Sequence, residues 1–177
     1  ISINDIDIID SAYMVSGAVD YWCNILKNNT FDLSRISLWL TKTKYSLINT
    51  FATDNQKQDG NKNNVILWNT IKDVYCNTED IKVFNALPFI AKNQNIEKVS
   101  CIFLYLNSNP KTYISDAYRT QKGTDAQLKK YDPKDAYLVD ERYLQGDTSV
   151  ENITSWFNFW KKLGVKHEIT EILISSV

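Results

Sequence analysis

Residues 113–118 read YISDAY, and residues 137–143 read YLVDERY. Each phrase runs aromatic, aliphatic, small, Asp and then a closing Tyr, and the two copies start 24 residues apart. An Asp that follows a short strand-like dipeptide and precedes an aromatic residue favours a turn or a helix N-cap. The repeat therefore predicts that Asp116 and Asp140 are structural equivalents, each ending a short strand and capping the turn that brings Tyr118 or Tyr143 inward.

An aromatic helix is predicted after the second phrase. Thr148 with Glu151 three residues later forms a capping box, and Gly164 after Leu163 stands where a left-handed C-cap belongs. The helix is therefore expected over 148–163. Its buried stripe is predicted to be Ile153, Trp156, Phe157, Trp160 and Leu163.

The pattern leaves Phe159 at an exposed edge of this helix. An exposed aromatic residue with a polar rim can mark a protein contact, so Phe159, Lys162 and Arg142 form a candidate contact surface. Stacking of the helix's aromatic rings on bases or sugars is the alternative, but few basic residues surround them.

The first half of the chain has a helical pattern. Apolar stripes predict a helix over 11–28, a second one after Asp32 and a third that includes Val65, Trp68, Ile71 and Tyr75. Residues 77–80 are expected to cap a short helical segment through Phe84. Residues 53–63 (TDNQKQDGNKN) predict an exposed flexible loop and an internal hinge.

After Pro88 the sequence favours strands. Residues 99–106 (VSCIFLYL) form a continuous apolar run of β-favouring residues, and residues 165–174 favour a terminal strand over a helix. The predicted fold class is α+β, with a helical half packed on a small mixed sheet and the 148–163 helix across it. The expected subdomains are a helical one over 1–76 and an α+β one over 77–177, together forming one compact unit.

Composition indicates a cytoplasmic domain with an aromatic core. The 177 residues carry a formal net charge of -1 and 12% aromatic residues, and the lack of a basic patch makes nucleic-acid binding unlikely. Three widely spaced cysteines are typical of reduced thiols. No apolar run approaches the roughly 20 residues of a membrane span, so no membrane partner is expected, and the start at Ile1 indicates a piece of a longer protein.

Residues with catalytic or ligand-binding potential are few. His167 is the only histidine, and the five glycines lie at least 18 residues apart, so we expect no metal site and no phosphate-binding loop. Asp116, Asp140 and Glu141 could supply paired carboxylates for acid-base catalysis, but turns and caps explain them better. The acidic residues at positions 5, 7 and 10 lack the glycine and distal Glu of a calcium loop. No catalytic residue and no cofactor is predicted.

The segment 87–165 joins a Leu-Pro pair, an aliphatic strand, the two Tyr phrases and an aromatic helix that ends in FWKKLGVK. This arrangement resembles the region downstream of the ATPase domain in large sacsin-like bacterial proteins, where a histidine-kinase/heat-shock-90-type (GHKL) domain precedes long α+β segments. It covers under half of the chain. The resemblance implies membership of a multidomain, chaperone-like or defence-related ATPase whose nucleotide site lies outside this chain. The glycines of the ATP lid are absent here, so no catalytic residue is carried over.

The expected function is therefore that of a non-catalytic interaction or transmission module. Its partners would be other domains of the parent protein or a separate protein. Two alternatives stay open: an enzyme domain that acts on nucleic acid or carbohydrate through carboxylates, and a stand-alone binding protein of a phage-defence system.

Overall fold

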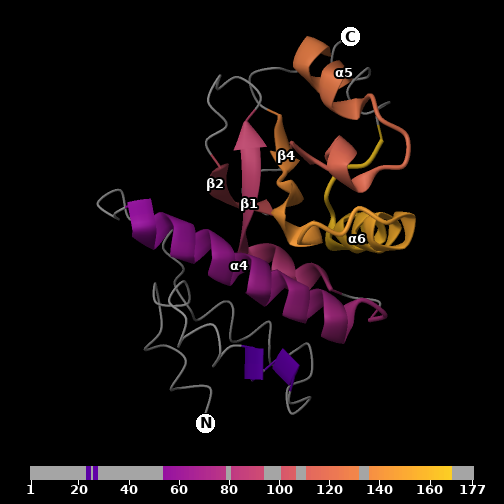
Figure 1. Ribbon diagram of the computed structural model, residues 1–177. Helices are drawn as coiled ribbons and strands as arrows, with labels where there is room; N and C mark the ends of the chain where they lie inside the picture. Colours follow the sequence, from indigo (N-terminus) through magenta and orange to yellow (C-terminus); the bar gives the residue numbers. More distant parts are fainter. Residues whose placement is uncertain are drawn as a thin grey trace. The chain divides into compact units, whose positions relative to one another are not determined.

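The computed structural model describes residues 23–24, 26–27, 54–78, 81–93, 101–106, 111–131 and 136–168 (Figure 1). The chain divides into two compact units, Ile1–Phe89 and Ile90–Val177. The described residues between 23 and 27 are helical. The rest of the helix predicted over 11–28, the helix predicted after Asp32 and the acidic residues at 5, 7 and 10 lie outside the described residues.

Helix α4 (Asp54–Tyr75) dominates the described part of the first unit. Its predicted apolar stripe is confirmed, with buried side chains at Val65, Leu67, Trp68, Ile71 and Tyr75. The loop and hinge predicted over 53–63 are wrong, because this helix already begins at Asp54. Once a helix exists, each added residue gains one hydrogen bond, and the Gln and Lys residues here are good helix formers. The single Gly60 costs only about 1 kcal/mol.

Two side-chain hydrogen bonds join α4 to the helical residues near position 25. Thr70 Oγ1 donates to Cys23 Sγ at 3.3 Å, and the Tyr75 hydroxyl donates to the Leu26 carbonyl at 3.2 Å. Among the described residues, neither Cys23 nor Cys76 forms a disulfide. These contacts fix the α4 face that carries the apolar stripe.

A short 3-10 helix, η3 (Lys82–Ala86), follows α4. The rings of Tyr75 and Phe84 lie 5.1 Å apart between centroids, so burial of Phe84 anchors the segment. The predicted cap at 77–80 is wrong, because the N-cap is Ile81 and makes no side-chain capping bond. Apolar burial, with Ile81 and Phe84 both fully buried, replaces the cap here.

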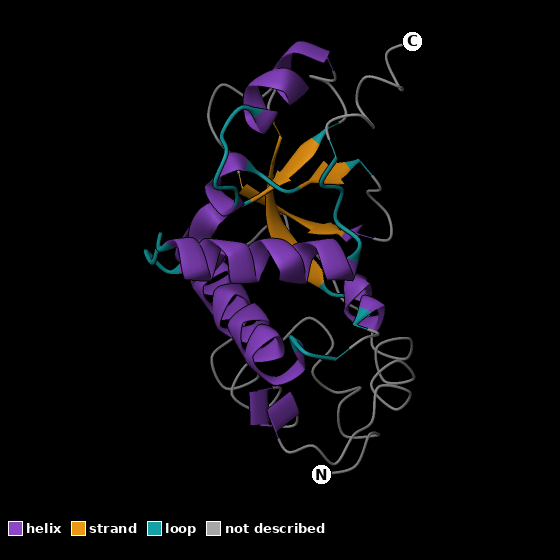
Figure 2. Cartoon of the chain, turned by 90° about the vertical axis from the view of Figure 1, so that its right-hand side faces the viewer, coloured by secondary structure: helices purple, strands orange, loops and turns teal. Residues whose placement is uncertain are grey.

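A mixed four-stranded sheet in the order β2-β1-β4-β3 lies in the second unit, except that β1 begins at Pro88, before the unit boundary (Figure 2). Its strands are β1 (Pro88–Asn93), β2 (Cys101–Tyr105), β3 (Thr112–Tyr113) and β4 (Tyr137–Val139). β1 and β4 are antiparallel, whereas β3 and β4 are parallel. The α+β class is confirmed, as is the strand predicted within 99–106. A parallel bridge joins Tyr113 to Lys166, which gives the start of the predicted terminal strand a sheet contact. Residues 169–174 lie outside the described residues.

Short helices connect and cover the strands of this unit. The 3-10 helices η5 (Asp116–Tyr118) and η6 (Glu141–Leu144) follow β3 and β4, and helix α5 (Thr124–Tyr131) lies between the two Tyr phrases in the sequence. Helix α6 (Val150–Leu163) contacts both η5 and η6. The predicted aromatic helix is therefore confirmed, and it packs on the two turns that the Tyr phrases form.

The C-terminal end of α6 lies where the sequence predicts it, and the N-terminal end lies one residue later than predicted. Gly164 is the C-cap at φ 111°, as predicted, whereas the N-cap is Ser149 rather than Thr148. Ser149 Oγ accepts from Asn152 N at 3.3 Å, while Asp147 Oδ1 accepts from Ser149 N at 3.1 Å. The hydroxyl of the neighbouring Ser149 can cap the helix as well as that of Thr148. The hydrogen bond that Ser149 N donates to Asp147 Oδ1 holds Ser149 in place.

The aromatic core of the second unit is built from α6 and the closing tyrosines. The rings of Trp156 and Trp160 are 5.4 Å apart, and Tyr143 and Trp160 are 5.2 Å apart. Phe159 is only 2% exposed, so its predicted exposure is wrong, and Phe157 is half-buried instead. At about 100° per residue these two positions flank the stripe at similar angles on opposite sides, so the period alone does not decide between them.

Candidate functional site

The two Tyr phrases lie side by side in the sheet. β3 and β4 are parallel, with Thr112 opposite Tyr137 and Tyr113 opposite Leu138. Residues that pair across these two strands are therefore 25 positions apart in the sequence, one more than the 24 positions that separate the starts of the two phrases. This register places the closing tyrosines, Tyr118 and Tyr143, at matching positions, and Ser115 rather than Asp116 matches Asp140.

Three side chains tie the phrases to each other and to β1. The Tyr118 hydroxyl donates to the Asp140 carbonyl, and Ser115 Oγ donates to the Val139 carbonyl at 2.9 Å. The Tyr143 hydroxyl accepts from the backbone N–H of Ile90 at 2.7 Å. Burial raises the pKa of Tyr118 well above its ordinary value, so the hydroxyl stays protonated and keeps its donor role.

Asp140 is a structural cap, as predicted. Its side chain is 2% exposed, and Oδ1 accepts from Arg142 N at 2.8 Å. Lys92 Nζ lies 3.8 Å from Oδ2, and Arg142 Nε lies 3.8 Å from Oδ1. The buried carboxylate thus starts η6 and is partly balanced by two cations.

Asp116 has a different role from the one predicted. It is the first residue of η5 rather than its N-cap, which is Ser115. Its Oδ1 accepts from Thr124 N at 2.9 Å and its Oδ2 from Gly123 N at 3.1 Å. The carboxylate therefore satisfies the first N–H groups of α5, and the predicted equivalence of the two aspartates is wrong.

The segment 116–125 is closed by reciprocal bonds. Asp125 Oδ1 accepts from the backbone N–H of Asp116 at 2.9 Å. Lys122 Nζ donates to the Asp116 carbonyl and to the Arg119 carbonyl. Burial, with a smaller contribution from Asp116, raises the pKa of Asp125. These bonds hold residues 119–124 as a fixed loop.

This loop forms one wall of an open pocket of about 390 Å³ in the second unit. Residues of α6 form another part of the lining. The lining residues are Tyr118, Arg119, Thr120, Gln121, Lys122, Gly123, Thr124, Gln127, Thr154 and Phe157. Pockets of this size hold small ligands or the side chains of a docked segment.

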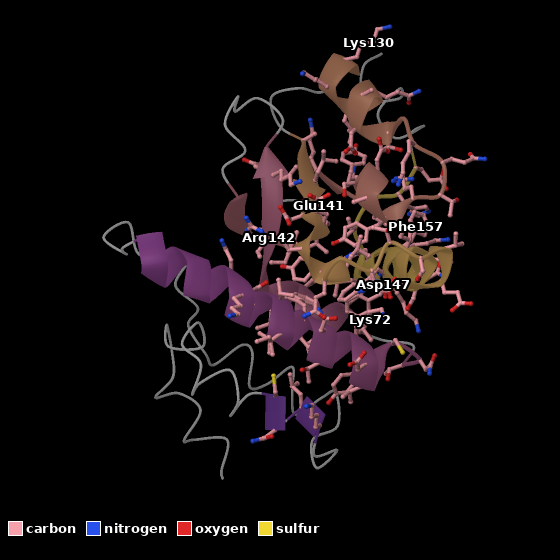
Figure 3. The ribbon with its side chains drawn as sticks, viewed as in Figure 1. Lys72, Lys130, Glu141, Arg142, Asp147 and Phe157 are labelled. Carbon is pink, nitrogen blue, oxygen red and sulfur yellow. The ribbon has the colours of Figure 1, made fainter. Side chains whose placement is uncertain are left out.

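Arg119 and Phe157 are the most distinctive pair in the pocket. The guanidinium carbon lies 5.4 Å from the centre of the Phe157 ring, which is a cation–π distance. Figure 3 shows Phe157 on α6. Arg119 Nε donates to the Ile114 carbonyl at 3.0 Å, so the residue that follows β3 and the Phe157 ring of α6 together position the cation. Burial lowers the pKa of Arg119, and Asp116 is the foremost of the carboxylates that counter this.

The candidate contact residues from the sequence do not line this pocket. Arg142 is exposed beside Asp140, Lys162 is half-buried, and Phe159 lies in the aromatic core. His167 is half-buried, with Nε2 3.2 Å from Glu168 Oε1. Figure 3 shows Arg142 next to Glu141 on η6. The three candidates therefore do not form one exposed patch around Phe159.

The sequence pattern does not single out Arg119 and Phe157 as a site. Their only local signal is the run of small and polar residues RTQKGT over 119–124. Helical periodicity predicts Phe157 in the buried stripe of α6, and nothing in the sequence brings it to Arg119. The contact depends on tertiary structure.

No family model, no curated protein and no solved structure matches this chain. Within the described ranges, no group of three or more His, Cys, Asp or Glu residues could hold a metal ion. Among the residues that the structure describes, no helix has both the length and the apolar composition that a membrane span needs.

Proposed function

We propose that this chain is a non-catalytic interaction module of a larger sacsin-like ATPase, and that the 119–124 pocket is its contact surface. The observation that carries the proposal is the pocket itself, in which Arg119 stacks on Phe157 and polar side chains surround them. A segment of another domain of the parent protein would dock there. The sacsin-like parent rests on the resemblance of segment 87–165.

The construction of the pocket supports a binding role. The Tyr118, Ser115 and Tyr143 side chains cross-link the two Tyr phrases and β1, and the bonds of Asp116 and Asp125 fix the loop. A preformed wall reduces the entropy that binding must overcome. The Asp116 and Asp140 carboxylates accept backbone N–H groups, which favours structural roles for them over acid-base catalysis.

Hydrogen exchange tests this function. The backbone amides of 120–122 would be measured in this chain alone and in the longer protein that contains it. We expect at least about tenfold slower exchange in the longer protein, since docking excludes water from the loop. The amides of 156–160, inside α6, serve as the internal control and should not change. Equal exchange of 120–122 in both proteins would refute a contact by another domain.

A further inference from the structure

The backbone of residues 120–122 has hydrogen-bonding groups that no described part of the chain uses. The bonds that fix this loop involve its flanks, at Asp116, Arg119, Gly123 and Thr124. No hydrogen bond joins a backbone N–H or carbonyl of 120–122 to another described residue. These three residues are exposed and line the pocket, so water or a ligand must satisfy their donors and acceptors.

The charges around the pocket favour an uncharged ligand. Arg119 and Lys122 are in the lining, and none of the described lining residues is acidic, so a cationic ligand would meet two like charges. The carboxylates of Asp116, Asp125 and Glu168 act on Arg119 from outside the lining. Three carboxylates outnumber the two cations, so an anionic ligand gains no net attraction.

Neutral side chains from two helices complete the lining. Gln127 of α5 and Thr154 of α6 are exposed, and neither side chain hydrogen-bonds to another described residue. An amide and a hydroxyl can each donate and accept. The half-buried Phe157 ring adds apolar surface to the lining. The matching ligand group is therefore small and uncharged, both donates and accepts, and is carried on a short aliphatic stem.

We infer that the pocket binds a carboxamide side chain, Asn or Gln, of the docking segment, and that Gln127, Thr154 and the backbone of 120–122 hydrogen-bond to it. A carboxamide has one carbonyl acceptor and an NH₂ group with two donors, which suits a wall of neighbouring donors and acceptors. The inference rests on the proposed function in taking this pocket as the contact surface. It adds the chemistry of the ligand, an uncharged polar peptide side chain.

Amide NMR on the isotope-labelled full chain tests the inference at about pH 7 and constant ionic strength. The probes are the N-acetyl methylamides of asparagine, aspartate and leucine, whose side chains have nearly the same shape but are neutral and polar, charged, and apolar. We expect the asparagine probe to shift the amides of 120–122 with a dissociation constant on the order of millimolar. The aspartate and leucine probes should each bind at least about threefold more weakly, because the first brings a charge and the second cannot hydrogen-bond through its side chain.

Variants separate the pocket from general surface binding. Thr154→Val keeps the shape of the side chain and removes its hydrogen-bonding group, so the asparagine probe should bind at least about threefold more weakly. Thr148→Val is the matched control, because Thr148 is exposed and does not line the pocket, and it should leave binding unchanged. Gln127→Leu on the other helix should weaken binding as Thr154→Val does, and it decides the matter if Thr154→Val loses its dispersed spectrum.

Each other outcome overturns the inference. Equal binding of the aspartate or leucine probe, or an equal response of the Thr154 and Thr148 variants, would exclude a carboxamide held in this pocket. Tighter binding of methyl glucoside in the same measurement would assign the pocket to a sugar instead. The two proposals also fail separately. Slow exchange of 120–122 in the longer protein without a preference for asparagine would refute only the ligand class, and a preference for asparagine without slow exchange would refute only the docking of another domain.

Discussion

Replacing Asp116 and Asp140 by Asn should give opposite results, although the two residues occupy the same place in their sequence phrases. Both Asp116 oxygens accept backbone N–H groups, Oδ1 from Thr124 and Oδ2 from Gly123. An amide has only one oxygen, so Asp116→Asn turns an NH₂ group toward one of these donors. Since Asp116 is half-buried, we expect a loss of about 1–2 kcal/mol of unfolding free energy, close to that of Asp116→Ala.

Asp140→Asn should be milder than Asp140→Ala. The amide oxygen can still accept from Arg142 N, which is the capping bond of η6. The lost charge weakens contacts to Lys92 and Arg142 that are 3.8 Å long and involve partly exposed cations, a loss of about 1 kcal/mol or less. Asp140→Ala removes the cap as well and should cost about 1–3 kcal/mol.

Urea denaturation followed by tryptophan fluorescence measures all four variants. Glu141→Gln is the matched control, because Glu141 adjoins Asp140 and its side chain is 66% exposed. It should change stability by less than about 0.5 kcal/mol. The reasoning is refuted if Asp116→Asn is as mild as the control, or if Asp140→Asn costs as much as Asp140→Ala.

Three further predictions concern packing, backbone and pH. Trp160→Ala should cost about 3–5 kcal/mol, because the ring is fully buried; a melting temperature within about 2 °C of the wild type would contradict this. Gly164→Ala should cost about 1–2 kcal/mol in urea denaturation through its φ of 111° alone, since the nearest atom to an added Cβ, in Leu106, is 3.8 Å away; an unchanged stability would show that the helix end can relax. The folded-state pKa of Asp125 is raised above 3.8, so protonated Asp125 contributes stability at low pH that is lost as pH rises through the folded pKa. Asp125→Asn should therefore gain stability relative to the wild type as the pH rises from below the ordinary Asp pKa of 3.8 through the raised folded-state pKa, and a difference that stays constant with pH would refute the burial of that carboxylate.

The sequence predicted the features of the second unit that depend on local physics. The C-cap at Gly164 follows from the need for a left-handed residue after Leu163. The buried positions Trp156 and Trp160 follow from helical periodicity. The start of α4 at Asp54 does not follow from the sequence, because a polar stretch without an apolar stripe predicts exposure, and both an exposed helix and a loop satisfy that pattern.

The site depends on contacts that the sequence does not contain. Arg119 and Phe157 are 38 positions apart in the sequence, and their stacking requires η5 to pack on α6. Strand register also depends on tertiary structure. The first Tyr residues of the two phrases are 24 positions apart in the sequence, whereas strand pairing places Tyr113 opposite Leu138. The register differs because it is set by packing and not by the order of residue types.

The offset of one residue between phrase and register explains how the repeat produced a pocket. In the second copy the acid falls at the N-cap, so Asp140 starts η6 and is buried. In the first copy the cap position holds Ser115, whose hydroxyl bonds the Val139 carbonyl of the other copy. The acidic residue of the first copy, Asp116, comes one position later. Its carboxylate accepts hydrogen bonds from the first N–H groups of α5 instead. These bonds hold the loop that carries Arg119, so a shift of a single acid along a repeated turn distinguishes the copy that forms the pocket wall from the copy that forms the scaffold.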